Sequence, residues 1–287
     1  MKPAPFEYHT PGSLDEAAQL MTSLENAKLI AGGMSLGPML NFRYVIVDHL
    51  VDLGGVAELA GISLENGCLR IGAMTRQRDI EFSDLVREQV PLLTEGLRHT
   101  GHRQTRNRGT IGGSLSHFDP SAEQPTVCAA HDAVLEIVSA ARGRRRVPFA
   151  EFGRDFMTTA IEPDEILATI KIPVWPKGHG YGFHEFARRR GDFAVVACAA
   201  LLQLGHDRTV ERASITLAGV GSAPLRMREV EGLLTGRQLT PELVKKATKL
   251  AGDINPVEDA QATADYRRHL ARVLSGRAID DAAARAK

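Results

Sequence analysis

LIAGGMS at residues 29–35 and GTIGGSLS at residues 109–116 are two versions of one pattern. In each, a Gly-Gly pair follows an apolar residue and precedes a hydroxyl side chain. Because glycine has no Cβ, successive backbone N–H groups can converge on an anion, and a Ser or Thr hydroxyl adds a directed hydrogen bond. A diphosphate suits such a loop. Two of these loops, about 80 residues apart, suit an extended cofactor that is held from both sides.

Other phosphate and catalytic signatures are absent from the sequence. It has no GxGxxG, GxxxxGK[ST] or HExxH motif, which excludes the Rossmann fingerprint, P-loop nucleotide hydrolysis and the zinc protease helix. The paired glycine loops therefore indicate a less common dinucleotide-binding fold. The arginines Arg103, Arg106 and Arg108 precede the second loop and could neutralise a phosphate.

Composition describes an ordinary globular chain. It has 287 residues, enough for roughly two domains, with 43% hydrophobic and 24% charged residues. The 35 basic and 35 acidic side chains balance, which argues against a nucleic acid or an anionic membrane as partner. No signal peptide or apolar stretch of membrane-spanning length is recognisable, so we expect a soluble, cytoplasmic protein.

The three cysteines, Cys68, Cys128 and Cys198, are far apart and form no CxxC pair. We expect free thiols in a reducing compartment, and no iron–sulfur or zinc site on this chain. Among six histidines that could suggest a metal site, the nearest pair has no acidic third ligand at helical spacing, so they are interpreted as surface or loop residues: His99, His102, His117, His131, His179 and His184. A redox function would therefore require an organic cofactor or a partner chain.

Hydrophobic periodicity and turn residues predict a mixed chain with a linker at residues 173–180. A helix begins with the capping box at Ser13, and Asn66-Gly67 turns a hairpin over residues 62–71. Most of residues 99–125 is interpreted as an ordered functional loop. The other predicted strands are 28–31, 49–53, 134–138, 144–147, 165–172, 182–188, 194–204 (central in its sheet) and 213–220, and the other helices lie at 75–100, 227–234, 241–251 and 262–287.

One competing motif lies inside the first loop. Residues 33–37 read GMSLG and fit the GxSxG nucleophile elbow of serine hydrolases, with Ser35 as the nucleophile. That elbow normally follows several strands of a larger sheet, and only about 32 residues precede this one. The hydrolase is the alternative hypothesis from a different functional class.

The ordered series of motifs resembles the FAD-binding medium subunit of molybdenum hydroxylases, the carbon monoxide dehydrogenase and xanthine dehydrogenase family. The resemblance covers nearly the whole chain. The matching segments are FEYHTP (6–11), AGGMSLGP (31–38), IGAMT (71–75), GTIGGS (109–114), HFDPSAEQP (117–125), FARRRGDFA (186–194) and YRR (266–268).

The resemblance implies an α+β fold in two domains. Residues 1–175 would form an FAD-binding domain like that of vanillyl-alcohol oxidase, with α/β subdomains at about 1–55 and 56–175. Residues 179–287 would form a C-terminal domain with a small antiparallel sheet packed with helices.

The resemblance also implies a cofactor site without catalytic side chains or metal ligands. Its two loops would wrap the FAD diphosphate with backbone amides, Glu123 would accept hydrogen bonds from cofactor hydroxyls, and Leu167 and Phe193 would contact the cofactor. The implied cofactor-binding residues are Lys28, Leu29, Ile30, Ala31, Gly32, Gly33, Met34, Ser35, Thr110, Ile111, Gly112, Gly113, Ser114, Glu123, Leu167 and Phe193.

The implied activity is electron transfer within an oxidoreductase. FAD on this chain would take electrons from iron–sulfur clusters on a small subunit and pass them to an external acceptor. A large subunit would carry the molybdopterin cofactor, in a dimer of heterotrimers. Ser114 stands where many relatives have Asn, and Glu185 lies where many have Lys. A scaffold that kept the fold and lost the cofactor is therefore a further alternative.

Overall fold

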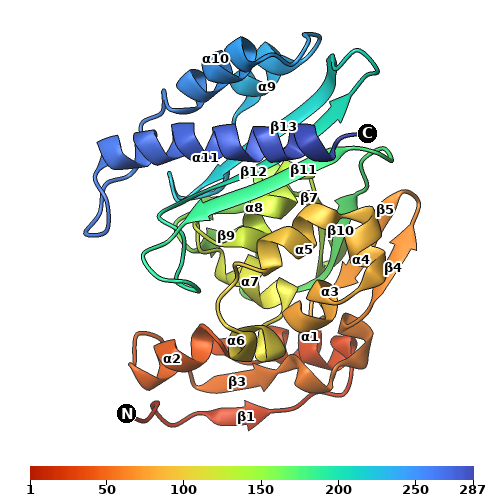
Figure 1. Cartoon of the computed structure of the whole chain (residues 1–287). Coiled ribbons are helices and arrows are strands. Elements are labelled where there is room, and N and C mark those ends of the chain that lie inside the picture. The colour runs from red at the N-terminus through yellow and green to blue at the C-terminus, as the bar shows by residue number, and fades with distance from the viewer.

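The computed structural model describes residues 1–287. Its N-terminal part is a three-stranded parallel sheet in the order β1 (Glu7–His9), β3 (His49–Asp52) and β2 (Ala27–Ile30), at the lower end of the molecule in Figure 1. Two helices accompany it, α1 (Leu14–Ser23) and α2 (Leu36–Asn41). The predicted capping box is confirmed, because Ser13 Oγ accepts a hydrogen bond from the Glu16 N–H.

A five-stranded antiparallel sheet follows, in the order β4-β5-β10-β6-β7. The hairpin at Asn66-Gly67 is confirmed: both residues have positive φ, 49° and 74°, as a type I′ turn requires. The strands are β4 (Ile62–Glu65), β5 (Cys68–Gly72), β6 (Val134–Ser139), β7 (Gly143–Pro148) and β10 (Glu165–Pro173), with a small pair β8 (Gly153–Asp155) and β9 (Thr158–Thr159) beside them. Helices α3 (Gln77–Glu81), α4 (Asp84–Gln89), α5 (Pro91–Leu97), α6 (Arg103–Arg108), α7 (Ile111–His117) and α8 (Glu123–Ala130) connect β5 to β6, and short 3₁₀ turns lie at Leu53–Gly55, Ala57–Leu59 and Phe149–Glu151.

The C-terminal part is an antiparallel sheet with helices on one face (Figure 1). β12 is central, as the sequence predicts, and the long helix α11 crosses the sheet. Gly180 and Gly182 permit this packing, because a Cβ at either position would collide with a backbone carbonyl of α11. The elements are β11 (Gly180–Phe186), β12 (Val196–Leu204), β13 (Val210–Ala218), β14 (Leu225–Arg226), α9 (Arg228–Leu234), α10 (Pro241–Ala251) and α11 (Ala264–Arg285). The predicted α+β fold is confirmed.

The largest hydrophobic core joins the two parts of the chain. Phe118, Phe149 and Phe152 pack with one another beneath the five-stranded sheet, with ring centroids 5.7–6.2 Å apart. The same core includes Phe183 of β11 and Leu201 of β12. The opposite face of the C-terminal sheet forms a second core with α9, α10 and α11. This core fixes the five-stranded sheet against the C-terminal sheet, and a smaller core that includes Val51, Val138 and Ile166 joins the three-stranded sheet to the five-stranded sheet.

The prediction of a loop over most of residues 99–125 is wrong, because α6, α7 and the start of α8 occupy it. Every residue of α8 is buried, so this helix has no polar face and shows no amphipathic period. α7 contains Gly112 and Gly113, which are poor helix formers. Tertiary packing overrides both signals.

Candidate functional site

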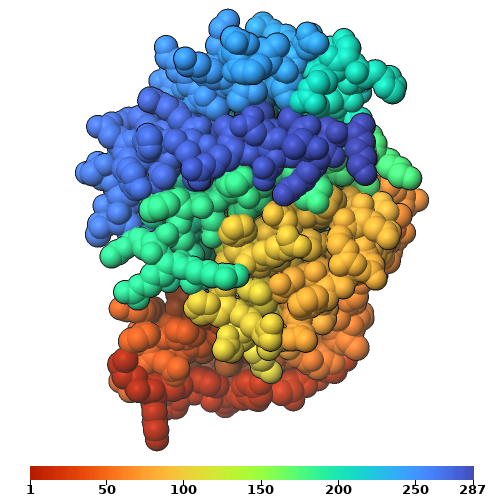
Figure 2. All heavy atoms as spheres, viewed as in Figure 1, coloured from red at the N-terminus to blue at the C-terminus, as the bar shows by residue number.

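One large cavity, of about 950 Å³, lies where the three sheets approach one another. Its walls come from the first glycine loop, the second glycine loop, the β9–β10 segment and residues 191–193 between β11 and β12. In the space-filling view this last segment projects toward the N-terminal region (Figure 2). A cavity of this size, lined by both apolar and polar groups, is typical of a cofactor site.

The cavity brings together the residues that the sequence assigns to a cofactor. All of them line it except Ile30 and Ile111. Ile30 packs against the small core around Leu40, and Ile111 is fully buried in the main core. Each loop thus packs one isoleucine into a hydrophobic core and places the neighbouring residues at the cavity.

The first glycine loop presents a row of free donors. The backbone N–H groups of residues 32–36 make no hydrogen bond to any protein acceptor, and Gly37 is the first to donate, to Gly33 O at 3.0 Å. Gly33 has φ of +72°, which turns the chain there. Consecutive unpaired amides beside a cavity are a fitting site for an anionic group such as a diphosphate.

The second glycine loop is different, since its amides are used within the protein. Ile111 N donates to Thr75 O, Gly112 N to Ala73 O, Gly113 N to Thr110 Oγ1 and Ser114 N to Thr110 O. A Cβ on Gly112 would lie 2.7 Å from Ala73 O, so only glycine permits this approach. The second loop therefore forms part of the cavity wall, including Ser114, without offering free backbone N–H groups to a ligand.

The two glycine loops also touch each other. A Cβ on Gly32 would collide with the carbonyl of Arg108 and lie 2.8 Å from Gly109 Cα. The shared pattern therefore has a structural reason beyond anion binding, because glycine at both places lets the loops meet.

Glu123 is a nearly fully buried carboxyl at the start of α8, on the cavity wall. Thr100 Oγ1 donates a hydrogen bond of 2.9 Å to Glu123 Oε2. Burial raises the pKa of Glu123 to about 7, and the nearby carboxylate of Glu185 adds to the rise. Glu123 can therefore change charge near neutral pH.

A histidine links this region to the C-terminal sheet. His99 Nδ1 lies 3.3 Å from Glu185 Oε1, which raises the pKa of His99 because a hydrogen-bonded carboxylate stabilises the imidazolium. Glu185 is on β11, and His99 follows α5. The ion pair therefore connects the two parts of the chain beside the cavity.

The arginines before the second loop do not supply a cavity charge. Arg106 donates from Nε to Glu81 Oε2 at 2.7 Å and from Nη1 to Thr100 O at 2.9 Å. Arg103 and Arg108 are exposed and do not line the cavity. Arg106 instead orders the segment that leads into α6.

Several residues that line the cavity are not among the predicted cofactor-binding residues. His117 and Asp119 follow the second loop, and burial lowers the pKa of His117 and raises that of Asp119. Thr158, Thr159 and Asp192 complete other parts of the wall. Polar residues directly after a glycine loop were the available signal for the first two. No local pattern marks the threonines.

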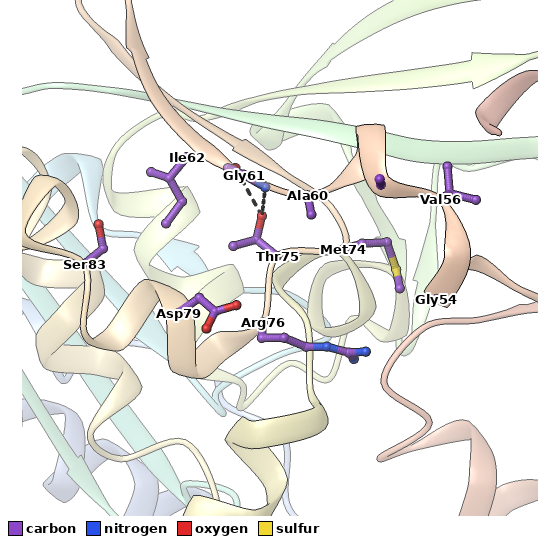
Figure 3. A pocket seen from close by; sticks show the side chains of 11 residues that line it. Gly54, Val56, Ala60, Gly61, Ile62, Met74, Thr75, Arg76, Asp79 and Ser83 are labelled. Atoms are coloured by element: carbon purple, nitrogen blue, oxygen red, sulfur yellow. Dashed lines mark hydrogen bonds between the residues drawn. The ribbon is translucent and has the colours of Figure 1, made fainter. Parts of the chain in front are cut away.

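A second, smaller pocket of about 440 Å³ lies between residues 54–62 and 74–83 (Figure 3). There Thr75 Oγ1 accepts a hydrogen bond from Gly61 N at 3.0 Å and donates to Gly61 O at 3.1 Å. These bonds hold the segment from which the Ala73 and Thr75 carbonyls reach the second glycine loop. The residues around this pocket therefore help to position the second glycine loop of the main cavity.

Ser35 lacks the surroundings of a nucleophile. Its side chain makes no hydrogen bond, whereas a serine hydrolase needs a histidine in hydrogen-bond contact with the hydroxyl. The preceding sheet has three strands, too few for a hydrolase sheet. The geometry favours the anion-binding interpretation of residues 33–37.

Comparisons with known proteins agree with this geometry. Residues 4–175 match the model for the FAD binding domain in molybdopterin dehydrogenase, and residues 181–282 match the carbon monoxide dehydrogenase flavoprotein C-terminal domain. The chain is 36% identical to 6-hydroxypseudooxynicotine dehydrogenase complex subunit alpha of Paenarthrobacter nicotinovorans over 100% of this chain and 97% of that protein. It is 36% identical to the carbon monoxide dehydrogenase medium chain of Hydrogenophaga pseudoflava over 99% of each.

Solved structures show the same fold. The carbon monoxide dehydrogenase structure from Hydrogenophaga pseudoflava matches with a TM-score of 0.96 and 36% identity over 100% of both chains. Quinoline 2-oxidoreductase from Pseudomonas putida 86 matches with a TM-score of 0.94 and 36% identity over 99% of both. The chain therefore belongs to the FAD-binding medium subunits of the molybdenum hydroxylase family, which are subunits of oxidoreductases.

Proposed function

We propose that this chain holds FAD in the large cavity, with the diphosphate on the first glycine loop. The unpaired amides of residues 32–36 support this assignment most directly. Lys28 also lines the cavity and adds the positive charge of an exposed ammonium group. Thr110 to Ser114 would close the opposite side, largely by shape, because their amides are engaged within the protein.

The remaining cavity residues divide between cofactor hydroxyls and the isoalloxazine ring. Glu123 would accept hydrogen bonds from cofactor hydroxyls, since its carboxyl is buried on the wall. Leu167 and Phe193 would pack against the ring. Leu167 is fixed within β10, whereas Phe193 is 50% exposed and would lose this exposure over a bound ring. Bound FAD supplies the redox chemistry, and the protein's own task is placement and tuning.

The relatives named above are subunits of complexes, and we propose that this chain also works in one. An iron–sulfur subunit would deliver electrons and a molybdopterin subunit would act on the substrate, in a dimer of heterotrimers. Cys128 and Cys198 support the need for a cluster-bearing partner: both are fully buried, and neither belongs to a group of side chains that could ligate a metal together.

An exposed apolar group beside the cavity suits a subunit contact. Phe42, Tyr44 and Ile46 are 54%, 80% and 58% exposed, and the rings of Phe42 and Tyr44 stack at 5.9 Å. Met39 and Val45 of the same segment line the cavity. We propose that a partner covers this group close to the flavin.

We propose that the chain is cytoplasmic, because its three cysteines are free thiols, which a reducing compartment maintains. None of the helices has the length and apolar character needed to cross a bilayer.

Flavin titration of the purified, flavin-free chain tests the cofactor assignment. We expect FAD to bind with one-to-one stoichiometry and much more tightly than riboflavin, because riboflavin lacks the diphosphate. Flavin fluorescence and absorbance report both equilibria. A chain that takes up no FAD would instead be the scaffold alternative. Equal affinity for riboflavin would contradict the diphosphate assignment.

A further inference from the structure

Three side chains of the N-terminal sheet lie together away from the flavin cavity. Glu7 and His9 are two residues apart on edge strand β1, and His49 of β3 lies directly opposite Glu7 in the parallel register. Side chains at positions i and i+2 of a strand share a face, and so do directly paired residues. β1 and β3 run side by side at the lower end of the molecule (Figure 1). The register therefore brings all three side chains to one face.

The potential ligand atoms of these residues are close together. His9 Nε2 lies 3.2 Å from His49 Nδ1, His49 Nδ1 lies 3.4 Å from Glu7 Oε2, and His9 Nε2 lies 3.9 Å from Glu7 Oε2. Zn²⁺ binds nitrogen and oxygen ligands at about 2.0–2.2 Å, which places neighbouring atoms of a tetrahedral site about 3.3–3.6 Å apart. Two of the three separations lie within about 0.1 Å of this range, and the third exceeds it by about 0.3 Å.

The types of ligand atom in this cluster favour some metal ions over others. Two imidazoles and one carboxylate suit Zn²⁺, whereas Mg²⁺ and Ca²⁺ prefer oxygen ligands throughout. The imidazoles are 24% and 21% exposed and thus partly fixed by packing, while Glu7 is 74% exposed. Water can therefore reach a fourth coordination position beside Glu7.

From these relationships we propose that Glu7, His9 and His49 form a Zn²⁺ site that links strand β1 to β3. β1 has only three residues and is an edge strand, so a metal shared with β3 would hold the N-terminal segment in the sheet. None of the three residues lines the flavin cavity. The site is thus separate from the flavin cavity.

The test uses the full chain after EDTA treatment and desalting. The protein is incubated with a small excess of Zn²⁺, desalted again and analysed by mass spectrometry for zinc per chain. Its melting temperature is recorded with and without Zn²⁺. We expect one retained Zn²⁺ per chain and a higher melting temperature with metal, because a ligand that binds only the folded state stabilises it.

Variants locate the binding. His9→Gln and His49→Gln should each lose the retained zinc, and Glu7→Gln should weaken binding by at least about tenfold, since even outer-shell changes cost that much. Glu7→Gln changes an exposed side chain, so its folding is secure, and circular dichroism checks the histidine variants. His206→Gln, at an exposed histidine elsewhere, is the matched control and should retain zinc. Zinc at background in the unaltered chain, or equal retention by the three variants, would overturn the proposal. FAD uptake by these variants should be unchanged, which separates this result from any failure of the cofactor assignment.

Discussion

Thr100 Oγ1 donates to Glu123 Oε2 at 2.9 Å in the cavity wall, and this is the one side-chain hydrogen bond that the buried carboxyl receives. The pKa of Glu123 is raised to about 7, mainly by burial. Because the folded pKa lies above the unfolded value, the folded state takes up the proton more readily. Glu123 therefore contributes stability that is complete below about pH 4.5 and is lost as the pH rises through about 7.

Glu123→Gln should remove this pH dependence from the flavin-free chain. Glutamine stays neutral, so the variant should gain in unfolding free energy relative to the unaltered chain between about pH 5 and 8. Denaturant titrations across that interval measure the difference, which includes a change in the contribution of His99, because the Glu123 charge helps to raise the pKa of His99. A difference that does not change with pH would mean that the carboxyl is ionised throughout.

The same substitution should weaken flavin binding. An ionised carboxylate accepts stronger hydrogen bonds from cofactor hydroxyls than an amide oxygen does, and the difference of about 1.5 kcal/mol corresponds to roughly tenfold in affinity. The effect should be larger at pH 8 than at pH 6, because Glu123 is charged only above about 7. Fluorescence titration with FAD at the two pH values measures it.

Gly112 and Gly37 form a matched pair for testing the close packing of the second loop. A Cβ on Gly112 would lie 2.5 Å from Ala73 Cβ, whereas a Cβ on Gly37 would meet nothing within 4 Å. Gly112→Ala should destabilise the fold by about 1–3 kcal/mol through overpacking. Gly37→Ala, within helix α2, should stabilise it by about 0.4–1 kcal/mol. Thermal or denaturant unfolding of both variants decides whether the approach of α7 to Ala73 is as tight as the structure shows.

Glu165 and Arg145 form a two-pronged ion pair at the cavity edge. Arg145 Nε and Nη2 each lie 2.7 Å from an oxygen of Glu165, and this hydrogen bonding lowers the pKa of Glu165. The pair thus contributes stability above the ordinary carboxyl pKa, and the contribution is lost as the pH falls through the lowered value. Glu165→Gln should cost about 1.5–3 kcal/mol at pH 7 and progressively less in acid. An equal cost at pH 7 and pH 3 would show that charge is not involved.

Local sequence signals predicted much of the fold. Asn66-Gly67 marked a hairpin because few other residues adopt two successive positive φ values, and Ser13 marked a helix through its cap. β12 was recognisable as a central strand because its residues are apolar without alternation. These elements depend on neighbouring residues in the chain, which a sequence displays directly. The division into residues 1–175 and 179–287 stays a prediction.

The sequence predicted which residues line the site, but not the different roles of its two glycine loops. The two Gly-Gly pairs look alike in sequence, yet one loop leaves its amides free while the other donates to Ala73, Thr75 and Thr110. Thr110 is the N-cap of α7 within the loop itself, whereas Ala73 and Thr75 lie far before the loop in the chain, so spacing carries no trace of these two acceptors. The same holds for Thr158 and Thr159, which reach the cavity only because the β8–β9 pair folds beside it.

Ser35→Asp is the most direct test of the central claim that the first glycine loop binds a diphosphate. Ser35 caps α2 without a side-chain hydrogen bond, so aspartate at this N-cap should leave the fold as stable or more so. Its carboxylate would compete with the diphosphate for the free amides of residues 32–36 and repel it. The neutral, similarly shaped Ser35→Asn is the control. We predict that Ser35→Asp loses at least about tenfold in FAD affinity, corresponding to about 1.4 kcal/mol, while Ser35→Asn and the affinity for riboflavin change little. Undiminished FAD affinity in a folded Ser35→Asp chain would contradict the account.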